Sequence, residues 1–325
     1  MIITQTPFRV SFAGGGTDFP DFYEKHGGSV VTTAIDKFVY CIVKKRFDDK
    51  IFVNYSRKEI VDTVDEIQHE LVREAMRKVG IEKGVEISFL ADIAAEGSGL
   101  GSSSSVTVSV LHALYTLVRH APTAEQLARE ACEIEIDILG KPIGVQDQYI
   151  AAYGGFRRLR FGPGSAIQIE DVDAPRGSLD DLESSMMMFF TGRTRKAANI
   201  LAEQKSGIST NVEMLTKIAG YAEDAFDLIH RGAIEPLGAL LDESWRVKRS
   251  LASAISDPEL DSIYDRAMNA GALGGKILGA GGGGFFLFLV PSACRQPVRD
   301  ALSDLRQLSF RFERGGSRVL LNVER

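Results

Sequence analysis

The chain has 325 residues, of which 44% are hydrophobic and 25% are charged, and a formal net charge of -6. This size and composition are typical of a globular protein with two domains or one large one. The net negative charge argues against a nucleic-acid partner, the short apolar runs argue against a membrane partner, and the three scattered cysteines show no zinc-ligand spacing. With an odd number of cysteines and no N-terminal signal pattern, the sequence predicts a cytoplasmic protein.

Strand and helix patterns alternate through the first half of the chain. The expected strands are residues 8–13, 29–46, 51–55, 85–90, 156–161 and 167–169, and the expected helices are 65–79, 102–119 and 123–139. A polar stretch that contains Asp, Pro and Gly follows at 171–184 and separates two regions of different pattern. We therefore expect a first domain over residues 1–183.

A strand pattern at 186–190 opens the second region, and two later strand patterns flank a glycine-rich turn at 279–284. The expected helices are 195–229, 233–251, 257–270 and 296–305, and the last two expected strands are 308–312 and 317–323. Strand, helices, two strands, helix and strand is the order of a ferredoxin-like layer. Residues 184–325 are therefore predicted as a second domain, and the whole chain as α+β.

The glycine- and serine-rich segment 97–105 is the most informative part of the chain. It reads Gly-Ser-Gly-Leu-Gly-Ser-Ser-Ser-Ser and leads directly into the apolar helical pattern of 102–119. Alternating glycines let a backbone approach a ligand closely, and a helix N-terminus attracts anions through its N–H groups and its dipole. Strong apolar patterns on both sides argue against a plain linker. The segment predicts a phosphate-binding loop, although the P-loop pattern G-x-x-x-x-G-K-S/T is absent.

A second glycine-rich segment, Gly279–Gly284, contains the pattern G-x-G-x-x-G. In a dinucleotide-binding fold this pattern follows a strand and opens a helix near the start of a βαβ unit. Here the aromatic and aliphatic run Phe285–Val290 follows it, and such a run predicts a strand. We therefore reject a dinucleotide-binding motif at this position.

A third glycine-rich segment, residues 7–18, reads Pro-Phe-Arg-Val-Ser-Phe-Ala-Gly-Gly-Gly-Thr-Asp. Together with 97–105 and 279–284, in this order, it resembles the three motifs of the GHMP kinases, a family that includes galactokinase, homoserine kinase and mevalonate kinase. One departure is Ala95, where the family usually has a proline. The resemblance spans nearly the whole chain. It implies the two-domain GHMP kinase fold, with a ribosomal-protein-S5-like N-terminal domain that binds nucleotide and a ferredoxin-like C-terminal domain.

The resemblance also implies that ATP and Mg²⁺ bind at the middle motif. The expected phosphate-binding residues are Gly97, Ser98, Gly99, Leu100, Gly101, Ser102, Ser103 and Ser104. The hydroxyl of Ser103 falls at the family's Mg²⁺ ligand, and Glu135 matches the glutamate that supplies a second ligand. One hydroxyl and one carboxylate suit Mg²⁺, because this ion usually keeps several waters.

The segment Gly144–Tyr149 resembles the family's catalytic-aspartate motif, which makes Asp147 the expected base. Its carboxylate would accept the proton of a sugar hydroxyl that attacks the γ-phosphate of ATP. Arg9 matches a basic residue that galactokinase-like members aim at the same centre, whereas an isolated arginine would more often form an ordinary ion pair. The residues implied in substrate binding are Gly15, Gly16, Thr17 and Asp18 of the first motif and Gly281 and Gly282 of the last.

The first motif also bears on the acceptor. Galactokinases carry Gly-Glu-His-Thr-Asp-Tyr where this chain has Gly-Gly-Gly-Thr-Asp-Phe at 14–19, so galactose is not expected. Residues 9–18 and 275–285 are similar to a bacterial branch of the family, the D-glycero-D-manno-heptose 7-phosphate kinases. That branch phosphorylates the anomeric hydroxyl to give the 1,7-bisphosphate used for nucleotide-activated heptose and surface polysaccharide. A distal phosphate needs cations, and the candidates are Arg193, Arg195, Lys196, Arg246, Lys248 and Arg249.

Two alternatives remain. Fucose kinases share the G-G-x-T-D pattern of the first motif, so an unphosphorylated 6-deoxyhexose is the second candidate acceptor. Some members of the superfamily are non-catalytic regulators, but the joint presence of Arg9, Ser103, Glu135 and Asp147 speaks against that role. The sequence leaves open the epimer, the anomer and a possible homodimer.

Overall fold

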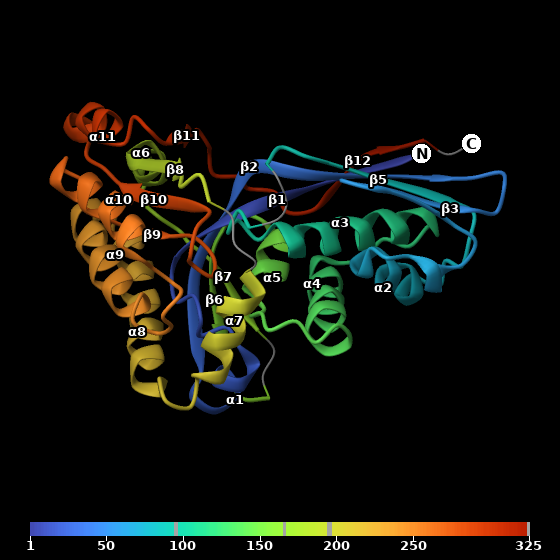
Figure 1. Ribbon diagram of the computed structural model, residues 1–325, viewed down its shortest axis with the longest axis horizontal. Helices are drawn as coiled ribbons and strands as arrows, with labels where there is room; N and C mark the ends of the chain where they lie inside the picture. Colours follow the sequence, from blue (N-terminus) through green and yellow to red (C-terminus); the bar gives the residue numbers. More distant parts are fainter. Residues whose placement is uncertain (94–96, 165–166, 194–196, 324–325) are drawn as a thin grey trace.

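Figure 1 shows the protein as a computed structural model in which residues 1–93, 97–164, 167–193 and 197–323 are described. Within these residues the larger sheet has eight strands, built around the long antiparallel pair β1 (Ile2–Ala13) and β2 (Gly28–Lys45). The other strands are β3 (Ile51–Asn54), β4 (Lys58–Val61), β5 (Val85–Ala91), β6 (Phe156–Phe161), β7 (Gln168–Asp171) and β12 (Arg318–Asn322). The first part of β2 pairs with β6 and its last part with β5, so one strand joins both ends of the sheet.

Helix α3 (Ser102–Leu117) is the centre of this half, where it packs on β1 and β2 (Figure 1). Its small hydroxyl side chains let it lie close to β1. The Ser105 hydroxyl donates to the Pro7 carbonyl at 2.8 Å, and the Ser109 and Thr4 hydroxyl oxygens are 3.0 Å apart. These bonds fix α3, and with it the loop that precedes it. The other helical segments here are α1 (Pro20–His26), a 3₁₀ turn (Val64–Glu66), α2 (Glu70–Val79), α4 (Ala124–Cys132), a π-helix (Glu133–Ile138) and α5 (Gln146–Tyr153).

The second half builds a smaller sheet with the strand order β11-β8-β10-β9. Its strands are β8 (Met186–Phe190), β9 (Gly274–Ile277), β10 (Phe285–Leu289) and β11 (Arg306–Leu308). Numbered within this sheet, the order is 4-1-3-2 and all pairs are antiparallel, which confirms the predicted ferredoxin-like layer. The helical segments are α6 (Ser178–Ser185), α7 (Ala197–Ser206), α8 (Val212–His230), α9 (Ile234–Lys248), α10 (Pro258–Asn269), a 3₁₀ turn (Ser292–Cys294) and α11 (Arg295–Ala301). No described helix is long and apolar enough to cross a membrane.

Several predicted elements need correction. The helix expected over 195–229 is two helices in the described residues, because the chain turns at Gly207–Asn211 between α7 and α8. The polar stretch 171–184 is not a simple linker, since it contains most of α6. Helix α5 and strand β4 carry no clear pattern in the sequence and were not expected.

The last predicted strand forms, but it joins the other sheet. Strand β12 pairs antiparallel with β1, from Ile2 opposite Asn322 to Gln5 opposite Arg318. The chain therefore returns at its C-terminal end to the sheet in which it began, and the division at 183/184 stays a prediction. A strand pattern shows which residues can pair, whereas the partner is selected by contacts between segments more than 300 residues apart.

Two glycine-rich loops hold the halves together by close backbone contact. A Cβ on Gly99 would lie 2.4 Å from the Leu278 carbonyl oxygen, and one on Gly279 would lie 2.7 Å from the Gly99 Cα. A Cβ on Gly284 would lie 2.6 Å from the Ser98 carbonyl oxygen. Only glycine fits at such separations, so these residues are needed for the contact as well as for their positive φ angles.

We predict that Gly99→Ala destabilises the protein more than Gly80→Ala. Both glycines have a φ of +76°, but a Cβ on Gly80 meets nothing within 4 Å. The left-handed backbone costs about 1–2 kcal/mol at either position, and the clash with Leu278 adds about 1–3 kcal/mol at Gly99 alone. The measurement is the free energy of unfolding in urea for both variants. Equal losses would mean that the loops separate at no cost.

Candidate active site

The site begins at the loop that leads into α3. Gly97, Gly99 and Gly101 have φ angles of +72°, +76° and +75°, and Gly101 immediately precedes the helix. The first N–H groups of a helix have no partner within it, so the start of this 16-residue helix is a position that favours anions, and phosphate binding there stays a prediction. Leu100 has a different position, because it is buried and its carbonyl accepts from the Arg9 amide at 3.0 Å.

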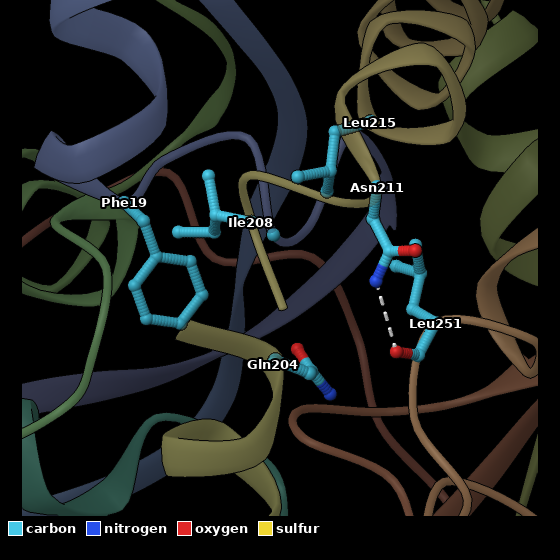
Figure 2. Close-up of a pocket in the computed structure, with 7 residues that line it drawn as sticks. Phe19, Gln204, Ile208, Asn211, Leu215 and Leu251 are labelled. Carbon is cyan, nitrogen blue, oxygen red and sulfur yellow. Dashed lines mark hydrogen bonds between the residues drawn. The ribbon is translucent and has the colours of Figure 1, made fainter. Parts of the chain in front are cut away.

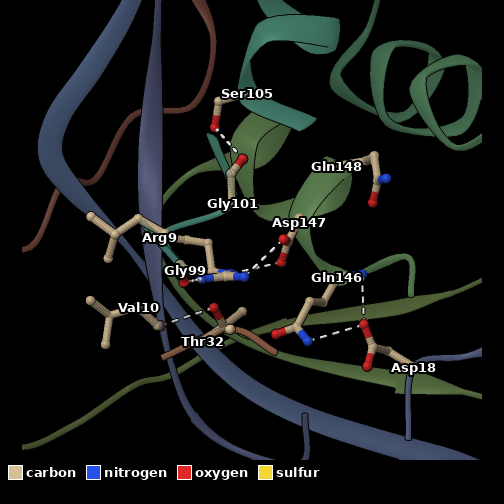
Figure 3. Close-up of polar contacts among 12 residues, drawn as sticks. Arg9, Val10, Asp18, Thr32, Gly99, Gly101, Ser105, Gln146, Asp147 and Gln148 are labelled. Atoms are coloured by element: carbon tan, nitrogen blue, oxygen red, sulfur yellow. Dashed lines mark hydrogen bonds and ion pairs between the residues drawn. The ribbon is translucent and has the colours of Figure 1, made fainter. Parts of the chain in front are cut away.

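Arg9 from β1 and Asp147 from α5 meet beside this loop (Figure 3). The guanidinium Nε and Nη2 donate to the two Asp147 carboxylate oxygens at 2.7 and 2.8 Å, and Nη1 donates to the Gly99 carbonyl at 2.5 Å. The arginine is almost fully buried, whereas 24% of the Asp147 side chain is exposed. A Cβ on Gly101 would lie 3.1 Å from the Arg9 Cγ and 3.3 Å from the Asp147 Cγ. The predicted pair therefore lies directly against the predicted phosphate loop.

Asp18 lies at the other side of the same centre and is also buried. Its Oδ2 accepts from the Gln146 side-chain amide at 3.0 Å and from the Gln146 backbone N–H at 3.3 Å, and its Oδ1 accepts from the Gly16 N–H at 3.0 Å (Figure 3). Burial, and then the nearby Asp147 carboxylate, raise the pKa of Asp18. A Cβ on Gly144 would overlap this carboxylate at 2.0 Å. The first motif and the catalytic-aspartate motif thus lock together through Asp18.

Thr17 holds the glycine turn rather than the open side of the site. It is fully buried, and its hydroxyl donates to the carbonyls of Gly14 and Ser29 at 2.8 and 3.0 Å while it accepts from the Ser29 N–H at 3.2 Å. The hydroxyl proton of Thr17 is therefore already engaged in hydrogen bonds within the fold. The hydroxyl thus has a structural role in the turn, and the predicted contact between Thr17 and substrate stays a prediction.

Glu135 and Ser103 form the predicted oxygen pair. The Ser103 hydroxyl donates to Glu135 Oε2 at 3.0 Å, and Gln148 Nε2 donates to Oε1 at 3.3 Å. The Glu135 side chain is fully buried, and burial raises its pKa against the opposing effect of Lys141, whose Nζ lies 4.0 Å away. The helix predicted over 123–139 forms without a break, but its last part, which holds Glu135, is a π-helix. A buried carboxylate beside an exposed hydroxyl fits a hard cation such as Mg²⁺.

Three of the four predicted distal-phosphate cations within the described residues already pair with carboxylates. Arg193 donates to Asp257 at 2.6 Å and to Glu259 at 2.7 Å, so two carboxylates at the start of α10 hold its guanidinium. Arg246 is exposed and pairs with Asp242 at 2.9 Å. The remaining candidates are Arg249, which pairs with Asp261 at 3.2 Å, Lys248, and Arg195 and Lys196, which lie outside the described residues, as does Ala95. The expected clamp at Arg193 is thus disfavoured, because a phosphate would have to displace two anions.

Gly281 and Gly282 line the inner side of the last motif. A Cβ on Gly281 would lie 2.8 Å from the Ile255 side chain, and the Gly282 N–H donates to the Ile255 carbonyl at 2.8 Å. Both glycines therefore pack on the loop that follows α9, and their predicted contact with substrate stays a prediction.

Two buried lysines lie at the site: Lys248, which the sequence analysis names among the candidate cations, and Lys276, which it missed. The ammonium of Lys248, at the end of α9, donates to the Gly279 carbonyl at 2.9 Å, and that of Lys276, in β9, donates to the Phe12 carbonyl at 3.1 Å. Burial lowers the pKa of Lys248 to about 8 and lowers the pKa of Lys276 well below its usual value. A lysine inside the apolar strand pattern 274–277 was the available signal, because a buried lysine rarely lacks a function.

A small pocket adjoins the first motif (Figure 2). It is lined by Gly16, Phe19, Gln204, Ile208, Asn211, Leu215 and Leu251. The Asn211 side-chain amide donates to the Leu251 carbonyl at 3.2 Å, and the Gln204 amide donates to the Ala280 carbonyl at 3.0 Å. The second half of the chain therefore forms one wall of the site beside the Gly16 turn.

Comparison with known proteins agrees with this geometry. The family GHMP kinases N terminal domain matches residues 54–155, and the family GHMP kinases C terminal matches residues 225–305. The D-glycero-alpha-D-manno-heptose 7-phosphate kinase of Campylobacter jejuni is 31% identical over 307 residues, which cover 89% of both chains. The L-fucokinase/L-fucose-1-P guanylyltransferase of Bacteroides fragilis is 28% identical over 91% of this chain and 35% of its own length.

The fold is shared along the whole chain with a solved structure. A D-glycero-D-manno-heptose 1-phosphate kinase from Bacteroides thetaiotaomicron matches 100% of both chains with a TM-score of 0.83 and 25% sequence identity. This chain is thus similar to kinases over nearly its full length. It also contains the three glycine-rich motifs, the two sheets and the Arg9–Asp147 pair. The protein belongs to the GHMP kinase family and is a phosphotransferase that acts on an alcohol acceptor.

Proposed function

We propose that the protein is an ATP- and Mg²⁺-dependent sugar 1-kinase whose acceptor is D-glycero-D-manno-heptose 7-phosphate. The observation that carries the proposal is the Arg9–Asp147 pair, held against the phosphate loop by the Gly99 carbonyl. The similarity to the heptose 7-phosphate kinase of Campylobacter jejuni supports the acceptor. The product would be the 1,7-bisphosphate, a precursor of nucleotide-activated heptose.

In this mechanism Asp147 is the base and Arg9 positions it. The anomeric hydroxyl oxygen attacks the γ-phosphorus, its proton passes to an Asp147 carboxylate oxygen, and the bond to ADP breaks. Each carboxylate oxygen accepts one bond from Arg9 and keeps a second lone pair for the hydroxyl. Arg9 has five N–H donors, of which the structure uses three, so two remain for the transferring phosphoryl group.

Ser103 and Glu135 are the residues that would hold Mg²⁺. When bound, this ion neutralises charge on the phosphates of ATP. The Ser103 hydroxyl and the Glu135 carboxylate oxygen lie 3.0 Å apart, so both would be available as neighbouring oxygen ligands. The π-helix and Gln148 keep the Glu135 carboxylate in place.

We predict that Asp147→Asn lowers kcat by about 10²- to 10⁴-fold and leaves nucleotide affinity near that of the wild type. The amide can still accept a hydrogen bond, but it cannot take the proton. The measurements are the steady-state release of ADP and the binding of a fluorescent ATP analogue. A variant with near-normal turnover would remove Asp147 from the role of base.

For Glu135→Gln we expect the Mg²⁺ concentration at half-maximal rate to rise at least about tenfold, because a charged ligand is lost. Without Mg²⁺ the variant should be as heat-stable as the wild type or more so, since a buried amide costs less than a buried carboxylate. Asp137→Asn, an exposed acid in the same π-helix, is the matched control. An unchanged Mg²⁺ dependence would place the metal elsewhere.

The acceptor is tested by a panel of sugars. Heptose 7-phosphate, or mannose 6-phosphate as a shorter mimic, should exceed free mannose, galactose and fucose in kcat/KM by about tenfold or more, because the distal phosphate adds charge-assisted hydrogen bonds. A fucokinase-like function is the second candidate, favoured by the 28% identity to the Bacteroides fragilis enzyme. If free fucose is the best substrate, that second function replaces the first.

A further inference from the structure

Lys248 places a buried ammonium at the first motif. It is the last residue of α9, only 7% of it is exposed, and its Nζ donates to the Gly279 carbonyl at 2.9 Å. A Cβ on Gly15 would lie 3.4 Å from this Nζ and 3.8 Å from the Gln146 side-chain nitrogen. Because Gly15 has no side chain, the space between it and the Lys248 ammonium stays open, next to the Asp18–Gln146 pair.

Within the described part of the chain, this ammonium forms no ion pair of its own. Among the residues that the structure describes, no carboxylate lies within ion-pair distance of Lys248. The two carboxylates that face it, Asp18 and Asp147, are already engaged by Gln146 and Gly16 and by Arg9, respectively. A buried cation in this situation is costly unless a ligand supplies the missing charge.

Two further polar atoms near Gly15 have no hydrogen-bond partner among the described residues. The Ser11 hydroxyl oxygen, 3.9 Å from a Cβ built on Gly15, and the Gln146 side-chain oxygen are buried without a hydrogen bond among the described residues. Buried polar atoms are normally paired, so unpaired ones need an explanation, and beside an unpaired ammonium a bound ligand provides one. An ammonium, a hydroxyl and an amide oxygen together suit a group that carries both negative charge and hydroxyls.

We propose that Lys248 binds the phosphate of a phosphorylated sugar acceptor and that the corner at Gly15 and Ser11 holds the part of the sugar next to that phosphate. This proposal rests on the proposed sugar-phosphate kinase function and supplies the cation that Arg193 does not provide. The phosphates of ATP have their own site at the start of α3. The acceptor phosphate is therefore the anion left for Lys248, which selects phosphorylated over neutral sugars.

The first test compares two acceptors in three proteins. For the wild type, Lys248→Met and Arg246→Met, kcat/KM is measured with mannose 6-phosphate and with free mannose. Methionine keeps the length of Lys248 without its charge, and Arg246 is an exposed, paired cation on the same helix. The preference for mannose 6-phosphate should fall by about 10- to 100-fold in Lys248→Met. It should remain in Arg246→Met, with the KM for ATP unchanged in all three.

The pattern of effects separates the possible roles. If Lys248→Met lowers kcat equally for both acceptors, the ammonium contacts the transferring phosphoryl group and the proposal is wrong. If the wild type prefers mannose 6-phosphate and Lys248→Met keeps that preference, the proposed function stands and the role of Lys248 falls. Thermal unfolding of each variant shows whether a loss of activity is a loss of fold.

Binding without turnover tests the proposal even if the proposed function fails. Mannose 6-phosphate is titrated calorimetrically into each protein loaded with Mg²⁺ and a non-hydrolysable ATP analogue. If the wild type prefers free mannose as substrate but binds mannose 6-phosphate through Lys248, the proposed function is wrong and the proposed role of Lys248 stands. The role of Lys248 is wrong if Lys248→Met binds mannose 6-phosphate as tightly as the wild type does. It is also wrong if the wild type does not bind mannose 6-phosphate.

The same titration has an expected pH dependence. Because the pKa of Lys248 lies at about 8, the ammonium loses its proton as the pH rises through 8 and the affinity for mannose 6-phosphate should fall. The other groups that face Lys248 are Arg9, Asp18, Asp147 and Lys276. These groups are present in all three proteins. An affinity that falls with pH in the wild type and in Arg246→Met, but not in Lys248→Met, would therefore be due to this lysine. Parallel profiles would contradict the proposal.

Discussion

The site depends on the three bonds of one buried guanidinium. Arg9 joins β1, the phosphate loop and α5 through its own backbone, the Gly99 carbonyl and the Asp147 carboxylate. These segments are far apart in the sequence, and the packing of α3 and α5 on the sheet together with this side chain holds them in one place. The planar fork of arginine fixes both distance and orientation, which a lysine could not do. A base held in this way is already oriented when substrate arrives.

Close backbone contact sets the second constraint. The turn at Gly279 packs directly on Gly99, so the second half of the chain touches the loop that holds Arg9. Lys248 donates to the carbonyl of that same Gly279. The position of Lys248, where we propose that the acceptor phosphate binds, is therefore coupled through two glycines to the position of the loop before α3. A shift of one half relative to the other would move both binding regions together.

Sequence reasoning found the loops and the polar residues, because glycine, serine and carboxylate patterns have local physical causes. It found the start of α3 at Ser102, and it paired Ser103 with Glu135 and Arg9 with Asp147 only through the family resemblance. It missed the π-helix, since nothing in residue periodicity marks one extra residue in a turn. It gave Arg193 a ligand role because the carboxylates of α10 lie more than 60 residues away. Contacts of that range leave no local signal.

Several ionisable groups of the site are buried. Burial raises the pKa of Asp18 and Glu135 and lowers the pKa of Lys248 and Lys276, so each of these groups is held where its charged form is disfavoured. A fold selected for stability alone would fill such positions with apolar side chains. On the functions proposed here, ligands of opposite charge would remove this penalty, a cation at Glu135 and an anion at Lys248. Part of the binding energy for metal and acceptor would then come from pairing these buried charges.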